Sequence, residues 1–367
     1  MRIDWEEVHS GRKGGALTPF LAGGSAIYGL GLRLYRMVQD KREPDSLPGF
    51  VVSVGNLTVG GTGKTPAAAM IARWAQGLGY RPVVLSRGYG RRKGAGSIIV
   101  LDGRGPRPDP AGAGDEPCLL SRSAPGVPVV VSRKRYSAGL YAHAEFASNF
   151  FILDDGFQHR MLHRDLDLVL LDAGDPLGNG HLLPWGPLRE PVWSLGRADA
   201  LLLTRCGEDN DRPGEEVARR FPGKPAFKSR HAPVEAVFPG AGLNRDPSFL
   251  KGKRVVAFCG IARPRVFRRS LERLGAIVTR FVPFRDHHLF DHAELEALKG
   301  VKRDMKADFL ITTEKDWVRL ASMTEDEPWV GFLRIQLELI PDSSAFFSMV
   351  RTAVEHCGVA PGDRVEY

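Results

Sequence analysis

The pattern of apolar and polar positions along the chain predicts an α/β protein with two successive groups of strands. In the first group, short continuous apolar runs alternate with helical segments; the runs span residues 51–54, 82–85, 98–101, 127–131, 150–153, 168–171 and 200–203. Continuous runs, in contrast to alternating ones, indicate strands that are covered on both faces. We therefore expect a mainly parallel sheet flanked by helices.

A second, smaller α/β group follows toward the C-terminus. Its predicted strands lie at 254–258, 277–282 and 309–312, and its predicted helices at 293–302 and 344–356. Between the two groups, residues 207–252 are richer in Gly, Pro and charge, which is typical of a linker. We expect an N-terminal helical segment at 1–42, a larger lobe at 43–225, a linker at 226–252 and a C-terminal α/β lobe at 253–367.

The N-terminal segment contains 19 residues without charge, at 14–32. Thr18 and Pro19 predict an N-cap followed by proline at the first helical position, and an apolar stripe with helical spacing runs from Phe20 to Val38. The stripe fits either an amphipathic helix packed on the protein or an interfacial helix whose cations, near 33–42, contact anionic lipid. Six glycines make a membrane span a poor third interpretation.

The segment 51–66, VVSVGNLTVGGTGKTP, carries the most specific short pattern: a strand, a glycine-rich turn and a helix. Such a turn points backbone N–H groups at a phosphate, and the helix N-terminus adds a partial positive charge. Lys64 would reach the β- and γ-phosphates, and the Thr65 hydroxyl would bind Mg²⁺. The predicted nucleotide-binding residues are Thr58, Val59, Gly60, Gly61, Thr62, Gly63, Lys64 and Thr65.

Two positions of this loop depart from common patterns. Thr58 stands where the standard phosphate loop has a glycine six residues before the lysine. Val59 stands where a class of switch ATPases carries a second lysine that acts in trans. The sequence therefore predicts a nucleotide site, and the missing second lysine disfavours the switch class.

Two apolar strands end in acidic residues, and either could supply a carboxylate for Mg²⁺. One strand leads into Asp154 and Asp155, and another leads into Asp172. A carboxylate at the end of a strand beside a phosphate loop orders Mg²⁺ directly or through water. Single acids after a strand also form turns or helix caps. We favour Asp154 and Asp155, because the polar run at 156–160 is denser than a turn requires.

Composition limits the class of partner. Lys and Arg number 51 against 43 Asp and Glu, which gives a net charge of +8 and a pI near 9.4. This excess favours an anionic partner such as a phosphorylated substrate or an acidic membrane surface. We do not expect nucleic acid, because the cations are dispersed among acidic motifs and no nucleic-acid module is recognisable. Four scattered cysteines without CxxC spacing argue against a zinc site.

Taken together, the motifs resemble those of the tetraacyldisaccharide 4′-kinases, which phosphorylate the lipid A precursor in Gram-negative bacteria. The matching pieces follow in order over nearly the whole chain: VGNLTVGGTGKTP at 54–66, SRGYGR at 86–91, GDEP at 114–117, LDDGFQHR at 153–160, RDLDLVLLDA at 164–173, LPWGPLREP at 183–191, FCGIARP at 258–264, FRDHH at 284–288 and TTEKD at 312–316.

The resemblance implies roles for individual residues. Asp154 and Asp155 would serve Mg²⁺ and the reacting phosphoryl group, beside Lys64 of the loop. Asp115 of GDEP would pair with His287 of FRDHH, and this dyad would take the proton from the sugar hydroxyl. The other motif positions near the site are Glu116, Gln158, His159, Arg189 and Glu190.

The resemblance also implies fold, reaction and location. It implies a P-loop NTPase-like kinase domain at 43–225, a smaller second lobe, a substrate cleft between the lobes and an N-terminal helix that dips into the bilayer. The implied reaction transfers the γ-phosphate of ATP, with Mg²⁺, to the 4′-hydroxyl of tetraacyldisaccharide 1-phosphate, giving lipid IVA. The implied enzyme is a monomer on the anionic cytoplasmic face of the bacterial inner membrane.

Two other functions fit parts of the sequence. A membrane-associated switch ATPase or GTPase of the partitioning or metal-insertase type would hydrolyse nucleotide without a lipid acceptor. A basic nucleic-acid- or lipid-binding protein with a regulatory phosphate loop would show a sharply salt-dependent affinity for its polyanion. Neither alternative accounts for the ordered motifs beyond the phosphate loop.

Overall fold

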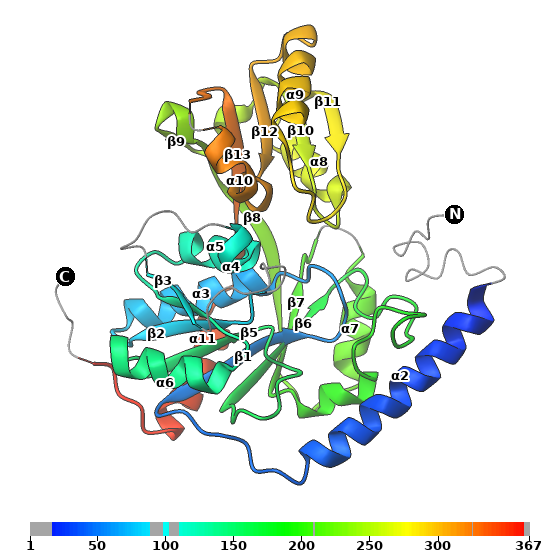
Figure 1. The fold of residues 1–367 in the computed structure, drawn as a ribbon, viewed down its shortest axis with the longest axis vertical. Coiled ribbons are helices and arrows are strands. Elements are labelled where there is room, and N and C mark those ends of the chain that lie inside the picture. Colours follow the sequence, from blue (N-terminus) through cyan, green and yellow to red (C-terminus); the bar gives the residue numbers. More distant parts are fainter. Residues whose placement is uncertain (1–16, 89–97, 103–109, 208–209, 325, 363–367) are drawn as a thin grey trace.

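A computed structural model describes residues 17–88, 98–102, 110–207, 210–324 and 326–362. Within these ranges one 13-stranded sheet runs through both lobes of the molecule (Figure 1). Its order is β11-β10-β12-β13-β8-β7-β6-β1-β5-β2-β4-β3, with β9 beside β8. Residues 1–16 of the predicted N-terminal segment, and residues 89–91 of the SRGYGR motif, lie outside the described residues.

The strands and helices alternate along most of the chain. The strands are β1 (Phe50–Asn56), β2 (Pro82–Ser86), β3 (Ile99–Leu101), β4 (Val129–Val131), β5 (Phe150–Asp154), β6 (Leu166–Asp172), β7 (Ala200–Thr204), β8 (Ala226–Phe238), β9 (Leu243–Arg245), β10 (Arg254–Cys259), β11 (Ile277–Pro283), β12 (Phe309–Thr313) and β13 (Val330–Ile340). The α-helices are α2 (Thr18–Gln39), α3 (Lys64–Gly77), α4 (Pro110–Ala113), α5 (Asp115–Ser123), α6 (Arg135–Phe146), α7 (Arg212–Arg219), α8 (Pro264–Arg273), α9 (His292–Asp304), α10 (Glu314–Leu320) and α11 (Ser344–His356).

The core of the larger lobe confirms the expected parallel sheet with both faces covered. β1 pairs in parallel with β5 on one side and with β6 on the other. Because successive side chains of a strand point to opposite faces, Val52 and Val54 pack with α3, α5 and α11, whereas Val51 packs with α6. The carboxyl ends of β1, β5 and β6 therefore meet at one edge of the sheet, where ligands bind in open α/β sheets.

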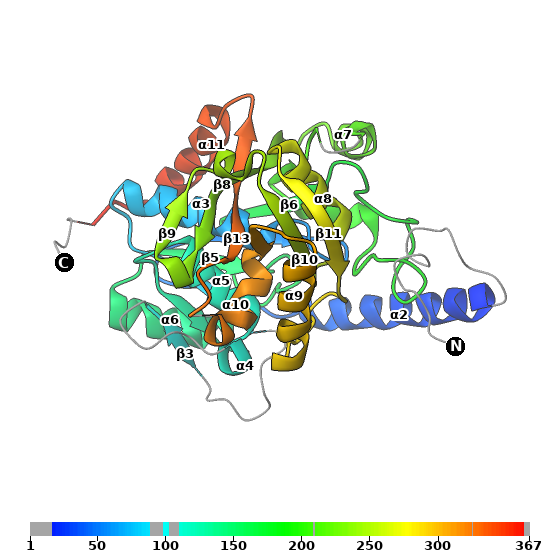
Figure 2. The same ribbon diagram turned by 90° about the horizontal axis from the view of Figure 1, so that it is seen from above.

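The connection between the lobes differs from the predicted irregular linker at 226–252. Residues 226–238 form β8, which pairs in parallel with β7 of the larger lobe and antiparallel with β13 along most of its length. β8 and β13 rise together from the larger lobe into the smaller one (Figures 1 and 2). The lobes are thus joined by a strand pair, and the exact domain boundaries stay a prediction.

Helix α2 lies along the outside of the larger lobe (Figure 2). It begins at Thr18 with Leu17 at the N-cap, so the prediction of Thr18 as the capping residue was wrong by one position. Ser25 Oγ donates to Leu182 O at 2.6 Å, and Tyr28 donates to Arg189 O at 2.9 Å. In the part of the chain that the structure describes, neither α2 nor another helix has the length and apolarity needed to span a membrane.

Candidate active site

The glycine-rich loop joins the end of β1 to the start of α3. Gly60 and Gly63 have φ values of 107° and 88°, a region that glycine enters at low cost. Gly63 is the N-cap of α3, so Lys64 and Thr65 lie in the first turn of the helix. A helix N-terminus behind a glycine turn offers backbone N–H groups and a partial positive charge to an anion. The local geometry is that of a phosphate-binding loop.

The loop is held from the end of β7. Thr204 Oγ1 donates to Thr62 O at 3.0 Å, and the guanidinium of Arg205 donates to Gly61 O. Arg205 has a φ of 59°, which is unfavourable for a residue with a side chain and marks a locally constrained backbone. These contacts tie the carbonyl groups of Gly61 and Thr62 to the end of β7.

Asp172, the alternative Mg²⁺ ligand, is engaged in ion pairs with two arginines. It forms an ion pair with Arg205, and Arg263 Nη1 from the smaller lobe lies 3.0 Å from its Oδ2. Its Oδ1 also accepts hydrogen bonds from the backbone of the following turn, at Gly174 and Asp175. Asp172 therefore acts as a turn and ion-pair residue.

Lys64 lies within a cluster formed by three side chains. Its Nζ is 3.1 Å from Asn56 Oδ1 and 3.6 Å from Asp155 Oδ1. Arg189 donates through Nη1 and Nη2 to the two oxygens of Asp155, each at 2.8 Å, and also to the carbonyl of Asn56 at 3.0 Å. Burial alone would raise the pKa of Asp155, but the charges of Lys64 and Arg189 outweigh it and hold the pKa well below its usual range. Asp155 is thus an ionised carboxylate beside the phosphate loop.

Asp154 is buried at the end of β5, and Ser86 Oγ donates to it at 3.1 Å. Burial, together with the negative charges of Glu116 and Asp155, raises the pKa of Asp154 to about 7. No three His, Cys, Asp or Glu side chains among the described residues form a metal cluster by themselves. Mg²⁺ commonly uses only one or two carboxylates and completes its shell with water and phosphate, so the pair at 154–155 fits this ion.

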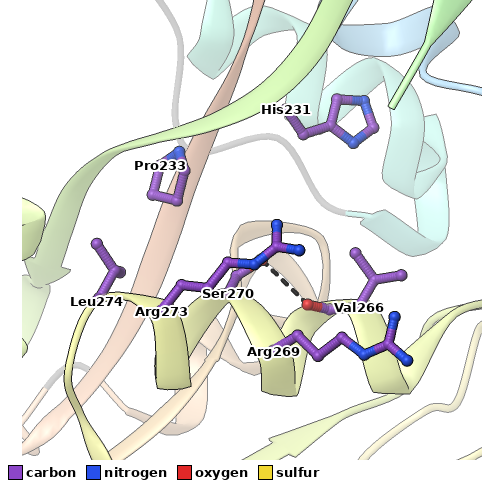
Figure 3. Close-up of a pocket in the computed structure, with 7 residues that line it drawn as sticks. All are labelled: His231, Pro233, Val266, Arg269, Ser270, Arg273 and Leu274. Atoms are coloured by element: carbon purple, nitrogen blue, oxygen red, sulfur yellow. Dashed lines mark hydrogen bonds between the residues drawn. The ribbon is translucent and has the colours of Figure 1, made fainter. Parts of the chain in front are cut away.

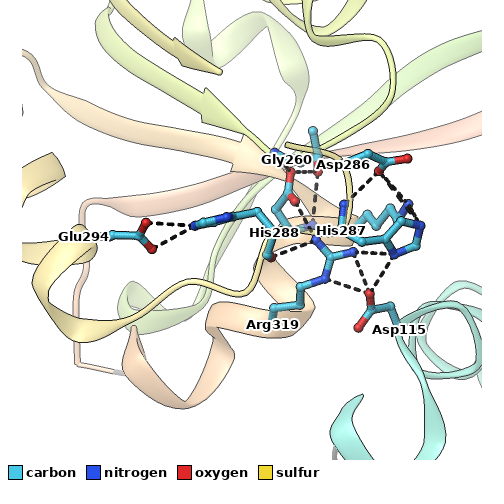
Figure 4. A network of polar contacts seen from close by, with 10 residues as sticks. Asp115, Gly260, Asp286, His287, His288, Glu294 and Arg319 are labelled. Carbon is cyan, nitrogen blue, oxygen red and sulfur yellow. Dashed lines mark hydrogen bonds and ion pairs between the residues drawn. The ribbon is translucent and has the colours of Figure 1, made fainter. Parts of the chain in front are cut away.

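Asp115 and His287 meet across the two lobes. Asp115 is the first residue of α5, His287 lies in the loop after β11, and His287 Nδ1 is 3.3 Å from Asp115 Oδ2 (Figure 4). Burial would raise the pKa of Asp115, but hydrogen bonds from His287 and Arg319 outweigh it and lower the pKa to about 2. His287 has a φ of 58°, so its backbone is held in a conformation that non-glycine residues seldom adopt.

Gln158 and His159 have supporting positions in the larger lobe. Gln158 Nε2 donates to the carbonyl of Asn56 at 3.0 Å, which links the turn after β5 to the end of β1. Burial and then the charges of Arg135 and Arg164 lower the pKa of His159 to about 4, so its imidazole is neutral at physiological pH. Both residues belong to the turn after β5 and not to the Asp115–His287 pair.

Comparisons with known proteins agree with this geometry. Residues 17–355 match the family described as tetraacyldisaccharide-1-P 4′-kinase. The chain belongs to this family. The tetraacyldisaccharide 4′-kinase of Syntrophus aciditrophicus is 41% identical over 309 residues, covering 81% of this chain and 82% of that protein. The corresponding kinase of Anaeromyxobacter sp. (strain K) is 47% identical over 278 residues, covering 74% and 72%.

A solved structure supports both the fold and the nucleotide. The chain resembles LpxK from Aquifex aeolicus in complex with ATP, with a TM-score of 0.72 and 33% identity over 92% of this chain and 98% of that one. The predicted P-loop NTPase-like fold is therefore confirmed. Members of this family are kinases of lipid A biosynthesis, and this is the function of the chain.

The side chain of Glu190 lies away from the phosphate loop, although the preceding residue, Arg189, contacts the loop's Asp155 partner. It is buried and pairs with Arg36 of α2 and with Arg197 Nη2 at 2.9 Å. The side chain of Arg189 points to the phosphate loop, whereas that of Glu190 points to α2. In this structure Glu190 anchors the N-terminal helix, and its motif position near the site stays a prediction.

We expect Glu190→Ala to lower the free energy of unfolding by about 3–5 kcal/mol, because it leaves the buried Arg36 and the partly buried Arg197 without their shared carboxylate. The matched control is Glu338→Ala, which breaks the exposed pair with Arg230 and should cost less than about 1 kcal/mol. Urea unfolding followed by circular dichroism measures both. Equal losses in the two variants would contradict the anchoring role.

Three residues of the site were missed at the level of sequence. Asn56 contacts both Lys64 and Arg189, Arg135 Nη2 donates to the carbonyl of Asp154 at 2.6 Å, and Arg319 contacts Asp115. Asn56 had a usable signal, since it is a polar residue at the end of an apolar strand that leads into the phosphate loop. Arg135 and Arg319 had none, because isolated arginines on short helices are ordinarily solvated.

A cavity of about 140 Å³ lies between β8 and α8. Its lining includes His231 on one side and Arg269, Ser270 and Arg273 on the other (Figure 3). Burial lowers the pKa of His231 to about 3, so the ring is neutral. A Cβ atom at Gly63 would lie 3.0 Å from His231 Nε2, so this lining residue also lies against the phosphate loop.

Proposed function

We propose that the chain transfers the γ-phosphoryl group of ATP to the 4′-hydroxyl of tetraacyldisaccharide 1-phosphate, with Lys64, Asp155, Asp115 and His287 as the catalytic residues. The contact between Asp115 and His287 carries this proposal. It joins a base in the smaller lobe to α5 of the larger lobe, where Glu116 is close enough to Asp154 to influence its pKa. This arrangement supports a proton acceptor close to the phosphate loop.

The chain's own groups account for each part of the transfer. A sugar hydroxyl is a weak nucleophile, so His287 Nε2 accepts its proton as the new O–P bond forms. Asp115 accepts the hydrogen bond from Nδ1 and orients the ring. The bond between the γ-phosphorus and the β,γ-bridging oxygen breaks, and the electron pair leaves on ADP. Lys64 and the N–H groups of the loop stabilise the charge on the transferred group.

We further propose that Thr65, Asp154 and Asp155 hold Mg²⁺. This ion, when bound, would neutralise phosphate charge. Support comes from the buried Asp154, which shares its surroundings with two other carboxylates and has Ser86 as its neutral hydrogen-bond donor. Arg189 and Lys64 keep Asp155 ionised and oriented toward the loop.

The deciding experiment is transfer of labelled γ-phosphate from ATP to tetraacyldisaccharide 1-phosphate in mixed detergent micelles. We expect labelled lipid to accumulate and ATP consumption to depend on the lipid. Rapid ATP hydrolysis without lipid, and no labelled lipid, would overturn the proposal in favour of the switch ATPase.

The proposed location is the cytoplasmic face of the bacterial inner membrane, with α2 as the contact to anionic lipid. Large apolar side chains on this helix are exposed, among them Phe20 at 79%, Ile27 at 75% and Leu30 at 59%. Exposed apolar side chains gathered on one helix indicate a binding surface, and a lipid substrate makes the bilayer the natural partner. We propose a monomer, because a single chain supplies both members of the Asp115–His287 pair.

We expect the double variant Ile27→Asp and Leu30→Asp to bind vesicles of phosphatidylethanolamine and phosphatidylglycerol at least about tenfold more weakly, since it removes two apolar side chains that would insert into the bilayer and adds two negative charges. The control carries Leu243→Asp and Ile277→Asp, which are also exposed but lie in the smaller lobe. Vesicle co-sedimentation measures both. Equal binding by the two double variants would exclude α2 as the membrane contact.

A further inference from the structure

Arg319 lies at the centre of the polar network around His287 (Figure 4). Its Nε donates to Asp115 Oδ2 at 2.7 Å, and its Nη2 lies 2.6 Å from the same oxygen. Asp115 belongs to α5 of the larger lobe, whereas Arg319 belongs to α10 of the smaller lobe. The oxygen that pairs with His287 therefore also receives both arms of a guanidinium from across the interface.

The guanidinium is itself fixed by the smaller lobe. Nη1 donates to Asp316 Oδ1 and to the carbonyl of His288, each at 3.2 Å. Asp316 is fully buried and accepts hydrogen bonds from the Thr313 hydroxyl at 2.7 Å and from the Gly260 N–H at 3.0 Å. The Arg319 side chain is only 2% exposed. The contacts with Asp316 and His288 thus fix the guanidinium within the smaller lobe, and the remaining nitrogens contact Asp115 of the larger lobe.

The network assigns the proton on the imidazole of His287. Asp115 Oδ2 is an acceptor 3.3 Å from Nδ1, and Lys315 Nζ is a donor 3.2 Å from Nε2. Because a carboxylate can only accept and an ammonium can only donate, we assign the hydrogen to Nδ1 and the lone pair to Nε2. Arg319 Nη2 also approaches Nδ1 at 3.2 Å, which follows from both groups donating to one carboxylate oxygen. The lone pair required of a general base is directed away from Asp115 and toward Lys315 Nζ, so the sugar hydroxyl would take the place of this ammonium when it binds.

We propose that Arg319 is a positioning residue for phosphoryl transfer: it holds Asp115 in the one orientation that fixes the His287 ring and its tautomer. This inference rests on the proposed roles of Asp115 and His287. A guanidinium suits the task because its planar fork spans Asp115 and Asp316 at once, which a lysine ammonium does not. Because the Arg319 side chain is only 2% exposed, we assign it no direct contact with the sugar hydroxyl or the phosphate.

The test separates positioning from simple stabilisation of the lobe interface. Arg319→Lys keeps the charge, and Arg319→Ala leaves a space that added guanidinium can enter. The matched control is Arg334→Lys, since Arg334 also bridges two acids in the smaller lobe, Glu314 at 3.0 Å and Glu235 at 2.5 Å. Each variant is assayed for kcat of lipid phosphorylation, KM for ATP and thermal unfolding.

We expect Arg319→Lys to lower kcat about tenfold with KM for ATP changed less than about twofold, and guanidinium to restore part of the kcat of Arg319→Ala. Arg334→Lys should keep the wild-type kcat. Asp115→Asn should add less than about threefold to the loss in the Arg319→Lys background, because both changes act through one carboxylate.

Two results would overturn the inference. One is a kcat for Arg319→Lys equal to that of Arg334→Lys. The other is a double variant, Arg319→Lys with Asp115→Asn, whose fold-loss in kcat equals the product of the two single losses. If Asp115→Asn alone leaves kcat unchanged, the proposed roles of Asp115 and His287 are wrong, and the positioning role of Arg319 is wrong with them. If Asp115→Asn is impaired and Arg319→Lys is not, the dyad stands and only the positioning role is lost.

Discussion

Replacement of Lys64 by alanine is expected to lower the rate of lipid phosphorylation by about 10³-fold. The ammonium is held by Asn56 and Asp155 at the start of α3, so it is positioned before substrate arrives. Its charge acts on the phosphoryl oxygens, where negative charge must be stabilised during transfer. The fold should persist, because Asp155 keeps both hydrogen bonds from Arg189.

The matched control for this experiment is Lys228→Ala. Lys228 lies on β8 and pairs with Glu215 on the surface at 2.6 Å. Initial rates of labelled phosphate transfer at saturating ATP compare the two variants, and thermal unfolding checks that both are folded. More than about a tenth of wild-type activity in Lys64→Ala would refute the assigned role.

Replacement of His287 by asparagine is expected to lower kcat by about 10²–10⁴-fold, the range for loss of a general base. Nucleotide affinity should change little, because His287 belongs to the smaller lobe and contacts Asp115, Lys315 and Asp286 rather than the phosphate loop. Asparagine keeps a polar side chain near Asp115 but offers no basic nitrogen to the sugar hydroxyl. Single-turnover phosphorylation of the lipid isolates the chemical step.

The adjacent histidine provides the control. His288 Nε2 lies 2.9 Å from both oxygens of Glu294, and its ring stacks on Phe284 with the centroids 4.7 Å apart. His288→Asn should therefore reduce thermal stability and leave kcat near the wild-type value. If the two substitutions reduce kcat equally, the effect comes from disturbance of the loop and the base is another group.

The accuracy of the sequence predictions depended on how deeply each strand is buried. The strands of the larger lobe, such as β5 and β6, are buried along their whole length and contain unbroken apolar runs at 150–153 and 168–171. β8 has the sequence AFKSRHAPVEAVF, and most of its residues are only partly buried. A strand that is half in contact with solvent and contains Pro233 resembles a linker, because the pattern records burial and not backbone pairing.

The same distinction applies to the site. The phosphate loop is built from residues that adjoin one another in the sequence, among them Lys64 and Thr65. Their spacing therefore already specified the loop and hence the nucleotide site. The chain order of the motifs likewise specified the family. These properties are local, or are sums of local properties, and no tertiary contact is needed to recognise them.

Only the tertiary structure decided which distant groups meet. Asp115 and His287 are 172 positions apart, and Asp115 and Arg319 are 204 apart. Arg189 and Glu190 are neighbours in sequence, yet one side chain binds Asp155 and the other holds α2. Such pairings depend on how the lobes and strands pack, because side-chain direction and long-range approach are set by the packed core and not by spacing along the chain.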